Sequence, residues 1–373
     1  GCAWENAAQH SSTMKFAEKP YKSLVADPVA RRVHIVDQTL LPFAVEHRAL
    51  ANWQEVAEAI LTMRVRGAPL IGVTAAFGVA LAMHEDATDA SLAKCLRALE
   101  ATRPTAVNLA WALVRMASLL QPADPAERAD LSWAEAERIR QEDIDINRRI
   151  GAHALELISG LHLKHQRPVN VLTHCNAGRM ACVDWGTATS PLYLAQQAGI
   201  PIHVWVEETR PRNQGLITRW ELADAGINCT YLADNAGGHL MQNGDVDLVF
   251  VGVDRVARNG DVANKIGTYL KALAAHDCGI PFYAFAPRSS IDVGLDVGVG
   301  VIPIESRSGD EVRLVRGMHR DGTIEEIRLL TPDAAVTNPG FDVTPARLVT
   351  GLVTEDGIFA PSALAATLVS ASQ

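Results

Sequence analysis

From Pro168 onward, short apolar runs alternate with segments of helical periodicity, and this alternation limits the fold more than any other feature. Five runs predict buried strands: Val169–Thr173, Ile202–Val206, Cys229–Leu232, Leu248–Val251 and Phe282–Phe285. Helix-like segments fall between them: Thr187–Ala198, Ile217–Ala225, Gly238–Gln242 and Ile266–His276. Because strands that alternate with helices form parallel sheets covered on both faces, we predict a Rossmann-like, doubly wound α/β fold. No GxGxxG motif opens any of these turns, so nothing supports a bound dinucleotide.

The first 160 residues follow a different, mostly helical pattern. Helices are predicted at Trp53–Met63, Leu70–Met83, Asp89–Ala101, Val107–Leu120 and from about Ala126 to Ser159. A short antiparallel pair is predicted from Val33–Asp37 and Phe43–Arg48. We therefore expect residues 1–13 to be a tag remnant or disordered tail, residues 14–160 a small helical domain with a short antiparallel sheet, and residues 161–373 the Rossmann-like domain.

Composition excludes several classes of protein. The chain has 373 residues, 48% of them hydrophobic, and a formal net charge of -9, which suits a globular protein and disfavours nucleic-acid or acidic-membrane binding. No apolar run approaches the roughly 20 residues that span a bilayer, and no secretory signal is visible. The six cysteines are scattered without a CxxC pair, which disfavours zinc ribbons and disulfide frameworks. We expect a cytoplasmic protein.

Asp254 lies where the strand Leu248–Val251 gives way to a loop. The carboxyl ends of strands are where open α/β sheets bind ligands, so an acid here is a candidate proton-transfer group. Asn264 and Lys265 are expected to open the next helix and to form an anion cradle beside it. For Asp254 to donate a proton near neutral pH, desolvation must raise its pKa. The alternative is a helix cap or a salt-bridge partner.

Cys175 follows the strand Val169–Thr173 and precedes a turn of small residues, Asn176–Gly178. A helix N-terminus or a nearby cation could lower the pKa of its thiol there. A thiolate at this position could accept a proton or stabilise developing charge. The alternative is a small buried hydrophobic side chain.

Two arginines precede helix starts in the same way, in Arg66–Pro69 and in Arg103–Asn108. Pro69 suits a first helical position, and the two small residues before it leave room for a ligand at a helix N-terminus. Thr105 is the predicted cap of the second helix, and each arginine could grip a phosphate bidentately. Gln214 is a candidate neutral ligand after another strand. Surface or interdomain ion pairs are the alternative for either arginine.

These segments carry a resemblance that reaches from about residue 30 to residue 360. They are Arg66–Pro69, Arg103–Leu109, Leu172–Asn176, Glu208–Pro211, Asp254–Arg255, Gly260–Tyr269, Ile302–Glu305 and Asn338–Ala346. Together they resemble the methylthioribose-1-phosphate isomerase family. The resemblance implies a small N-terminal domain joined to a Rossmann-like catalytic domain, usually as a homodimer.

The resemblance also implies roles for individual residues. The family's proton donor falls on Asp254, and its catalytic cysteine, described as a base or transition-state stabiliser, falls on Cys175. Its substrate-binding groups fall on Arg66, Gly67, Ala68, Arg103, Gln214, Asn264 and Lys265. No metal or organic cofactor is implied. Departures from the family pattern, such as Val253 in place of alanine, lie around the pocket and bear on which sugar it accepts.

The implied activity converts 5-methylthioribose 1-phosphate to 5-methylthioribulose 1-phosphate in methionine salvage. The phosphate at C1 blocks spontaneous ring opening, so Asp254 would donate a proton to the ring oxygen. Cys175 would then remove the C2 proton, or would only stabilise charge while a hydride moves from C2 to C1.

Other functions are compatible with the same segments. One is isomerisation of 5-deoxyribose 1-phosphate or of ribose 1,5-bisphosphate, substrates that differ only at C5. Another is a non-catalytic binding module, like the regulatory subunits of the translation initiation guanine-nucleotide exchange factor. Because a binding module needs neither Cys175 nor Asp254, their presence favours the enzyme. The expected partners are a sugar phosphate and a second copy of the chain, with no nucleic acid or membrane.

Overall fold

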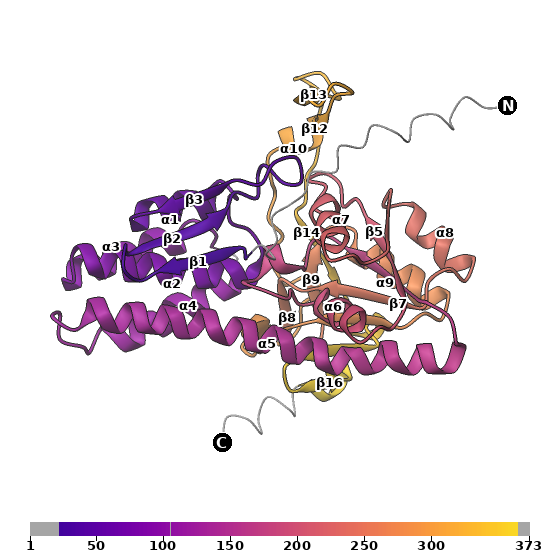
Figure 1. Cartoon of the computed structure of the whole chain (residues 1–373), viewed down its shortest axis with the longest axis horizontal. Helices are drawn as coiled ribbons and strands as arrows, with labels where there is room; N and C mark the ends of the chain where they lie inside the picture. Colours follow the sequence, from indigo (N-terminus) through magenta and orange to yellow (C-terminus); the bar gives the residue numbers. More distant parts are fainter. Residues whose placement is uncertain (1–21, 105, 365–373) are drawn as a thin grey trace.

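The computed structural model describes residues 22–104 and 106–364 and centres on a seven-stranded sheet (Figure 1). The strand order is β16-β15-β10-β7-β4-β5-β6. Their bounds are β4 (Val169–His174), β5 (Ile202–Glu207), β6 (Cys229–Leu232), β7 (Leu248–Gly252), β10 (Phe282–Phe285), β15 (Gly351–Thr354) and β16 (Gly357–Phe359). All neighbouring pairs in this sheet are parallel except β15 and β16. The predicted doubly wound α/β fold and its five strands are confirmed.

Helices cover both faces of this sheet. Alternate strand residues face opposite sides, so Val171 and Phe250 pack with α6 (Ser190–Gln197) and the C-terminal half of α5, near α7 (Gly215–Asp224). Leu172 and Val249 face α8 (Ala236–Gln242) and α9 (Thr268–Asp277) on the other side. Because both faces are buried, these strands are continuous apolar runs in the sequence.

The N-terminal part combines a three-stranded antiparallel sheet with a helical core. The strands are β1 (Leu24–Asp27), β2 (Arg32–Val36) and β3 (His47–Leu50), and the helices are α1 (Trp53–Leu61), α2 (Ala68–Glu85), α3 (Asp89–Glu100), α4 (Val107–Leu120) and α5 (Arg128–His165). The predicted pairing is present as β2 with β3, but the second strand begins at His47 because Phe43 lies in a turn that bonds back to Leu40. The sequence analysis missed β1, in which only Leu24 is buried.

Helix α2 corrects one expectation about membranes. By length and composition, this 18-residue helix of mean hydropathy 1.4 is able to span a bilayer, contrary to the expectation that no run approaches that length. It lies instead in the core, where α1, α3, α4 and α5 surround it. A helix that is apolar on all sides is buried either in lipid or in protein, and here protein covers it.

The long helix α5 runs beneath both parts of the molecule (Figure 1). It packs against α2 and α4 near one end and against α6 and β15 near the other. The predicted domain boundary between residues 160 and 161 lies within this helix, and the division into domains stays a prediction. The predicted tail, residues 1–13, lies outside the described residues.

A second, smaller sheet crosses the carboxyl edge of the first. It consists of β11 (Ile291–Asp292), β8 (Arg255–Ala257), β9 (Val262–Lys265) and β14 (Phe341–Thr344), in that order. Asn264 and Lys265 therefore end a strand, and the prediction that they open a helix is wrong. The physical reason is Gly267, whose φ of 102° separates β9 from α9.

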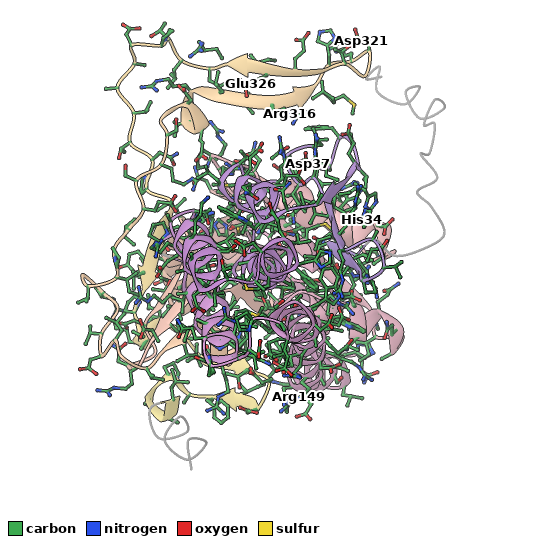
Figure 2. The ribbon with its side chains drawn as sticks, turned by 90° about the vertical axis from the view of Figure 1, so that its left-hand side faces the viewer. His34, Asp37, Arg149, Arg316, Asp321 and Glu326 are labelled. Atoms are coloured by element: carbon green, nitrogen blue, oxygen red, sulfur yellow. The ribbon has the colours of Figure 1, made fainter. Side chains whose placement is uncertain are left out.

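A two-stranded hairpin projects from the body of the molecule (Figures 1 and 2). It comprises β12 (Leu314–Met318) and β13 (Ile324–Arg328), preceded by the single turn of α10 (Asp310–Arg313). Arg316 ties it to the N-terminal part through a 2.6 Å hydrogen bond to the Thr39 carbonyl. Short 3-10 turns complete the fold: η1 (Arg179–Ala181), η2 (Arg288–Ser290), η3 (Ala346–Leu348) and η4 (Pro361–Ala363).

Candidate active site

A cavity opens at the carboxyl edge of the large sheet, where the strand order reverses. From β4 the chain proceeds through β5 and β6 toward one edge, whereas β7 and β10 lie on the other side of β4. Open α/β sheets bind ligands at such a reversal. Cys175 follows β4 and Asp254 follows β7, and the register pairs His174 with Val251 on these neighbouring strands. The two candidate reactive residues therefore extend from adjacent strand ends.

All nine residues predicted for the site line this one cavity. They are Arg66, Gly67, Ala68, Arg103, Cys175, Gln214, Asp254, Asn264 and Lys265. The cavity has a volume of about 110 Å³, counted as the space that the centre of a water molecule can occupy. Since one water needs only about 10–15 Å³ on that measure, a small organic molecule finds room here. Within the described residues, 22–104 and 106–364, every residue predicted for the site thus lies around one cavity.

The N-terminus of α2 forms one wall of the cavity. Gly67 is its N-cap with a φ of 97°, and Pro69 lies in the first turn. A Cβ atom on Gly67 would lie 2.4 Å from the Cα of Ala181, so this close approach requires glycine. The partial positive charge of the helix N-terminus faces the cavity and favours an anion.

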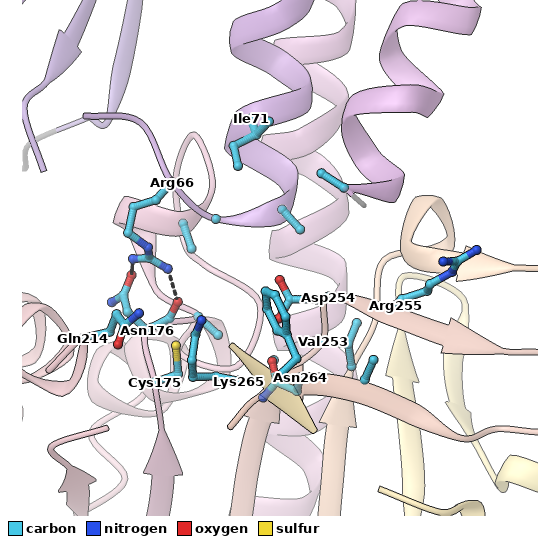
Figure 3. A pocket seen from close by; sticks show the side chains of 18 of the residues that line it. Arg66, Ile71, Cys175, Asn176, Gln214, Val253, Asp254, Arg255, Asn264 and Lys265 are labelled. Carbon is cyan, nitrogen blue, oxygen red and sulfur yellow. Dashed lines mark hydrogen bonds between the residues drawn. The ribbon is translucent and has the colours of Figure 1, made fainter. Parts of the chain in front are cut away.

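Arg66 is held by Asn176, the residue after Cys175 (Figure 3). Its Nη1 donates to Asn176 Oδ1 at 2.6 Å, and its Nη2 donates to the Asn176 carbonyl at 2.8 Å. Asn176 in turn donates to the buried carboxylate of Glu221 at 3.1 Å. Two bonds from one side of the guanidinium fix its orientation within the cavity.

Arg103 and Lys265 bring two more positive charges to the cavity. Arg103 lies in the loop before α4 and pairs with Glu305 at 3.4 Å, while the N-cap of α4 is Ala106. Thr105, the predicted cap, lies outside the described residues. The Lys265 ammonium lies 4.4 Å from the centre of the Phe341 ring, and burial lowers its pKa.

Asp254 has a partly buried carboxyl that lines the cavity and has no hydrogen-bond or ion-pair partner among the described residues. Burial raises its pKa, against the opposing charges of Lys265, Arg103 and Arg66. The alternatives of a helix cap or a salt bridge therefore find no support in residues 22–104 and 106–364. A carboxyl in such surroundings retains its proton at a higher pH than an exposed one and can act as an acid.

Burial also raises the pKa of the Cys175 thiol, although Lys265 and Arg66 act in the opposite direction. The expectation that nearby cations lower this pKa is therefore wrong in its net direction. Desolvation of a thiolate outweighs the attraction of the two cations because the side chain is buried on all sides except the cavity.

The remaining predicted substrate-binding side chains, those of Asn264 and Gln214, carry neutral amide groups. Asn264 donates to the Thr268 hydroxyl at 3.0 Å. Gln214 is 5% exposed, and its Oε1 has no hydrogen-bond partner among the described residues. Leaving a buried amide oxygen without a hydrogen bond costs free energy, and a hydroxyl of a ligand that donates to this oxygen would remove that cost.

Sequence reasoning missed several residues that line the cavity. Arg212 and Arg307 both pair with Glu311, at 2.8 Å and 2.7 Å. Arg212 is two residues from Gln214, a proximity that offered a local signal. Arg307 offered none, since it reaches the cavity from a polar segment far along the chain.

Beside the cavity, which His174 helps to line, lies a paired charge cluster formed by His174, Glu207, Asp234 and Lys271. The His174 Nδ1 lies 2.7 Å from Glu207 Oε2, and its Nε2 lies 2.8 Å from the Ile266 carbonyl. Burial opposes a charge on His174, but its bonds to Glu207 and Ile266 raise its pKa. Glu207 also pairs with Lys271 at 3.1 Å.

Three of these residues, His174, Glu207 and Asp234, have ligand atoms within 4.8 Å of one another, a spacing that metal ions accept. The Lys271 ammonium already supplies the positive charge beside Glu207. A cation would have to displace it, so the cluster fits an ion-pair network better than a metal site.

Comparison with known proteins gives the chain its family. The model of the initiation factor 2 subunit family matches residues 64–361. Methylthioribose-1-phosphate isomerase of Rhodospirillum centenum is 58% identical over 332 residues, 88% of this chain and 88% of that protein. The protein of the same name from Methylobacterium nodulans is 56% identical, covering 92% of this chain and 95% of that protein. The chain belongs to the methylthioribose-1-phosphate isomerase family.

Solved structures agree with the assignment to the methylthioribose-1-phosphate isomerase family. The 5-methylthioribose 1-phosphate isomerase of Pyrococcus horikoshii matches with a TM-score of 0.81 and 38% identity, covering 95% of this chain and 96% of that one. The translation initiation factor eIF-2B subunit delta of A. fulgidus matches with a TM-score of 0.75 and 36% identity, covering 92% and 96%. The fold is thus shared by proteins named as an enzyme and as an initiation factor subunit.

Proposed function

We propose that this protein is an aldose–ketose isomerase that converts 5-methylthioribose 1-phosphate to 5-methylthioribulose 1-phosphate. One observation carries the proposal: an unpaired, partly buried carboxyl, Asp254, and a buried thiol, Cys175, share a cavity whose walls hold Arg66, Arg103 and Lys265. The names of the most similar relatives support the same reaction.

The cations and the α2 N-terminus would hold the phosphate. Arg66 presents a guanidinium whose direction Asn176 has already fixed, so little ordering remains for binding. Preorganised donors of this kind in a site that excludes water bind a phosphate dianion more strongly than the same groups in water. Gln214 and Asn264 would take the sugar hydroxyls.

Asp254 would supply the proton that opens the ring. The bond between C1 and the ring oxygen breaks as the ring oxygen gains this proton. A hydrogen then moves from C2 to C1, and the C2 hydroxyl loses its proton as the ketone forms. The Asp254 carboxylate can accept that proton, because the two oxygens are attached to neighbouring carbons. One carboxyl is thereby returned to its starting state in each turnover.

The hydrogen transfer from C2 to C1 would occur as a hydride shift. Burial raises the pKa of the Cys175 thiol, which disfavours the thiolate that removal of a C2 proton requires and so favours the hydride shift. Cys175 would instead stabilise charge beside the two carbons. With substrate deuterated at C2, we expect the label to be retained at C1 of the product. Exchange of the label with solvent would establish proton transfer instead of a hydride shift.

The C5 substituent would meet apolar side chains, which favours a methylthio group. Met63, Ile71 and Ile302 line the cavity. A second phosphate would need unpaired cations, but Arg212 and Arg307 are already paired with Glu311. 5-Deoxyribose 1-phosphate lacks only the methylthio contact, worth about 1–3 kcal/mol. Comparison of kcat/KM for the three sugar phosphates tests the proposal, and no turnover of any of them would leave only the binding-module alternative.

We further propose a cytoplasmic homodimer that works without metal or organic cofactor and binds neither nucleic acid nor membranes. The net charge of -9 and the prevalence of two-fold symmetric dimers among soluble proteins support these expectations. Sedimentation analysis of the purified protein would test the dimer, and activity after treatment with a chelator would test the absence of a metal.

A further inference from the structure

Cys175 has a backbone conformation that is unusual for its residue type. Its φ is 66°, in the left-handed region, and it lies directly after β4. A residue with a Cβ atom in this region costs of order 1–3 kcal/mol and stays there only where its surroundings hold it. The structure must therefore contain contacts that hold this one residue.

Two buried threonine hydroxyls hold the peptide groups of Cys175 from both sides. The Cys175 N–H donates to Thr209 Oγ1 at 2.7 Å, and the Thr218 hydroxyl donates to the Cys175 carbonyl at 2.7 Å. The two threonines are 0% and 1% exposed. The parallel register of β4 and β5 ends at Thr173 and Val206, so these side chains replace the backbone partners that a continued strand would offer.

Both threonines are themselves fixed. The carboxylate of Asp234 accepts from the Thr209 N–H at 2.8 Å and from the Arg210 N–H at 2.9 Å. Thr218 belongs to α7, and its hydroxyl oxygen also accepts from the Asn176 side chain at 3.0 Å. Neither hydroxyl can turn away without leaving a buried polar group unpaired.

We infer that Thr209 and Thr218 are positioning residues, which hold Cys175 in the left-handed conformation and so direct its thiol into the cavity. Neither threonine lines the cavity, so they act through Cys175 and not on the substrate. The effect on turnover rests on the proposed function. The effect on where the thiol points does not.

The first test replaces each hydroxyl by a methyl group of similar shape. Thr209→Val and Thr218→Val should each lower kcat by about 10²-fold with little change in KM, because a misplacement of about 1 Å in a reacting group has that effect. Thr209→Ser keeps the hydroxyl and should restore kcat. Because both hydroxyls hold one residue, the double valine variant should lose much less than the product of the two single losses.

The second readout follows the thiol itself. Iodoacetamide alkylation, located by peptide mass spectrometry, distinguishes Cys175 from the other described cysteines at positions 95, 182, 229 and 278. In the unmodified protein, inorganic phosphate in the cavity should slow alkylation of Cys175. In Thr209→Val this protection should be lost, since the thiol no longer faces the cavity.

Thr173→Val is the matched control for simple loss of a buried hydroxyl. Thr173 lies two residues before Cys175, is 2% exposed and donates to the Phe250 carbonyl at 2.8 Å, and its hydroxyl has no hydrogen bond to Cys175. The Thr173→Val variant should lose about as much thermal stability as Thr209→Val. It should keep its kcat, and phosphate should still protect Cys175 from alkylation. Equal losses of kcat in the two variants would reduce the role of Thr209 to general stability and overturn the inference.

The outcomes separate this inference from the proposed function. Normal turnover in Cys175→Ala would remove the catalytic role of the thiol, and the alkylation pattern of Thr209→Val would still decide whether the threonine positions it. Unchanged kcat together with unchanged phosphate protection in both valine variants would refute the inference.

Discussion

Two groups of ionisable side chains adjoin at the end of β4, where His174 of one group also lines the cavity of the other, and they differ in how their charges are paired. Behind the strand end, His174, Glu207 and Lys271 neutralise one another through contacts of 2.7 Å and 3.1 Å. In front of it, Asp254 and Lys265 are partly buried in the cavity wall and have no ion-pair partner among residues 22–104 and 106–364. Burying an unpaired charge lowers the free energy of unfolding, so the front group destabilises the fold but can pair with a charged ligand. The charges of the rear group are already paired, and this group stabilises the fold.

The largest effect should come from removing the carboxyl acid of the front group. Asp254→Asn should lower kcat by about 10²- to 10⁴-fold, the range that general acid catalysis contributes. The melting temperature should stay the same or rise, because the variant no longer buries an ionisable group without a partner. Steady-state kinetics and calorimetry measure both. A variant that keeps near-normal turnover would remove Asp254 from the mechanism.

The rear group should respond in the opposite way. Glu207→Gln leaves the positive charges of His174 and Lys271 without their carboxylate, which should cost about 3–5 kcal/mol of unfolding free energy in urea. Glu208→Gln, one residue along the chain and partly exposed, is the control and should change stability by less than about 0.5 kcal/mol. Equal costs for the two variants would mean that the pairing of Glu207 contributes nothing particular.

Two lysines sharpen the contrast within one residue type. Lys265→Met should raise KM by about 10- to 100-fold, corresponding to the loss of one hydrogen bond to a charged group, and should not reduce stability. Lys271→Met should reduce stability and leave KM unchanged in the folded fraction, because it breaks the pair with Glu207. The comparison fails if both variants change the same quantity.

A third kind of carboxyl, Asp143 on α5, should show its effect only as pH changes. It accepts from the Val183 N–H at 2.8 Å and has no ion-pair partner among the described residues, and burial raises its pKa from 3.8 to about 7. Because the folded state binds this proton more tightly than the unfolded state, the stability that Asp143 contributes declines as pH rises from about 4 to 7. Asp143→Asn should lack this decline. Urea unfolding at several pH values should show a growing advantage of the variant up to about pH 7, and a constant difference would contradict the assignment.

The sequence predicted those parts of the fold in which burial leaves a pattern in neighbouring residues. The strands β4, β5, β7 and β10 are covered on both faces, so each is an apolar run with clear ends. The hairpin of β12 and β13 was missed because both of its faces are largely exposed and its sequence lacks an apolar alternation.

The site was predicted to the extent that its groups follow strand ends or helix starts. Asp254 and Arg66 do so, and both line the cavity. Lys265 was placed on the wrong element, because only the positive φ of Gly267 separates β9 from α9. The pairing of Arg212 with Glu311 and the bond from the Cys175 N–H to the Thr209 hydroxyl join segments that are far apart in the sequence. The net direction of the Cys175 pKa also depends on burial, which the sequence does not contain.

The two bonds from Arg66 to Asn176 have a consequence for any redesign of this cavity. Asn176 orients the guanidinium, and its chain neighbour Cys175 carries the sulfur. The residue that orients the anion-binding guanidinium and the residue beside the reacting carbons are therefore directly bonded through one peptide group. Shifting this dipeptide to accommodate a longer or shorter sugar would displace both ends of the bound molecule at once, so positions 175 and 176 have to be varied as a unit.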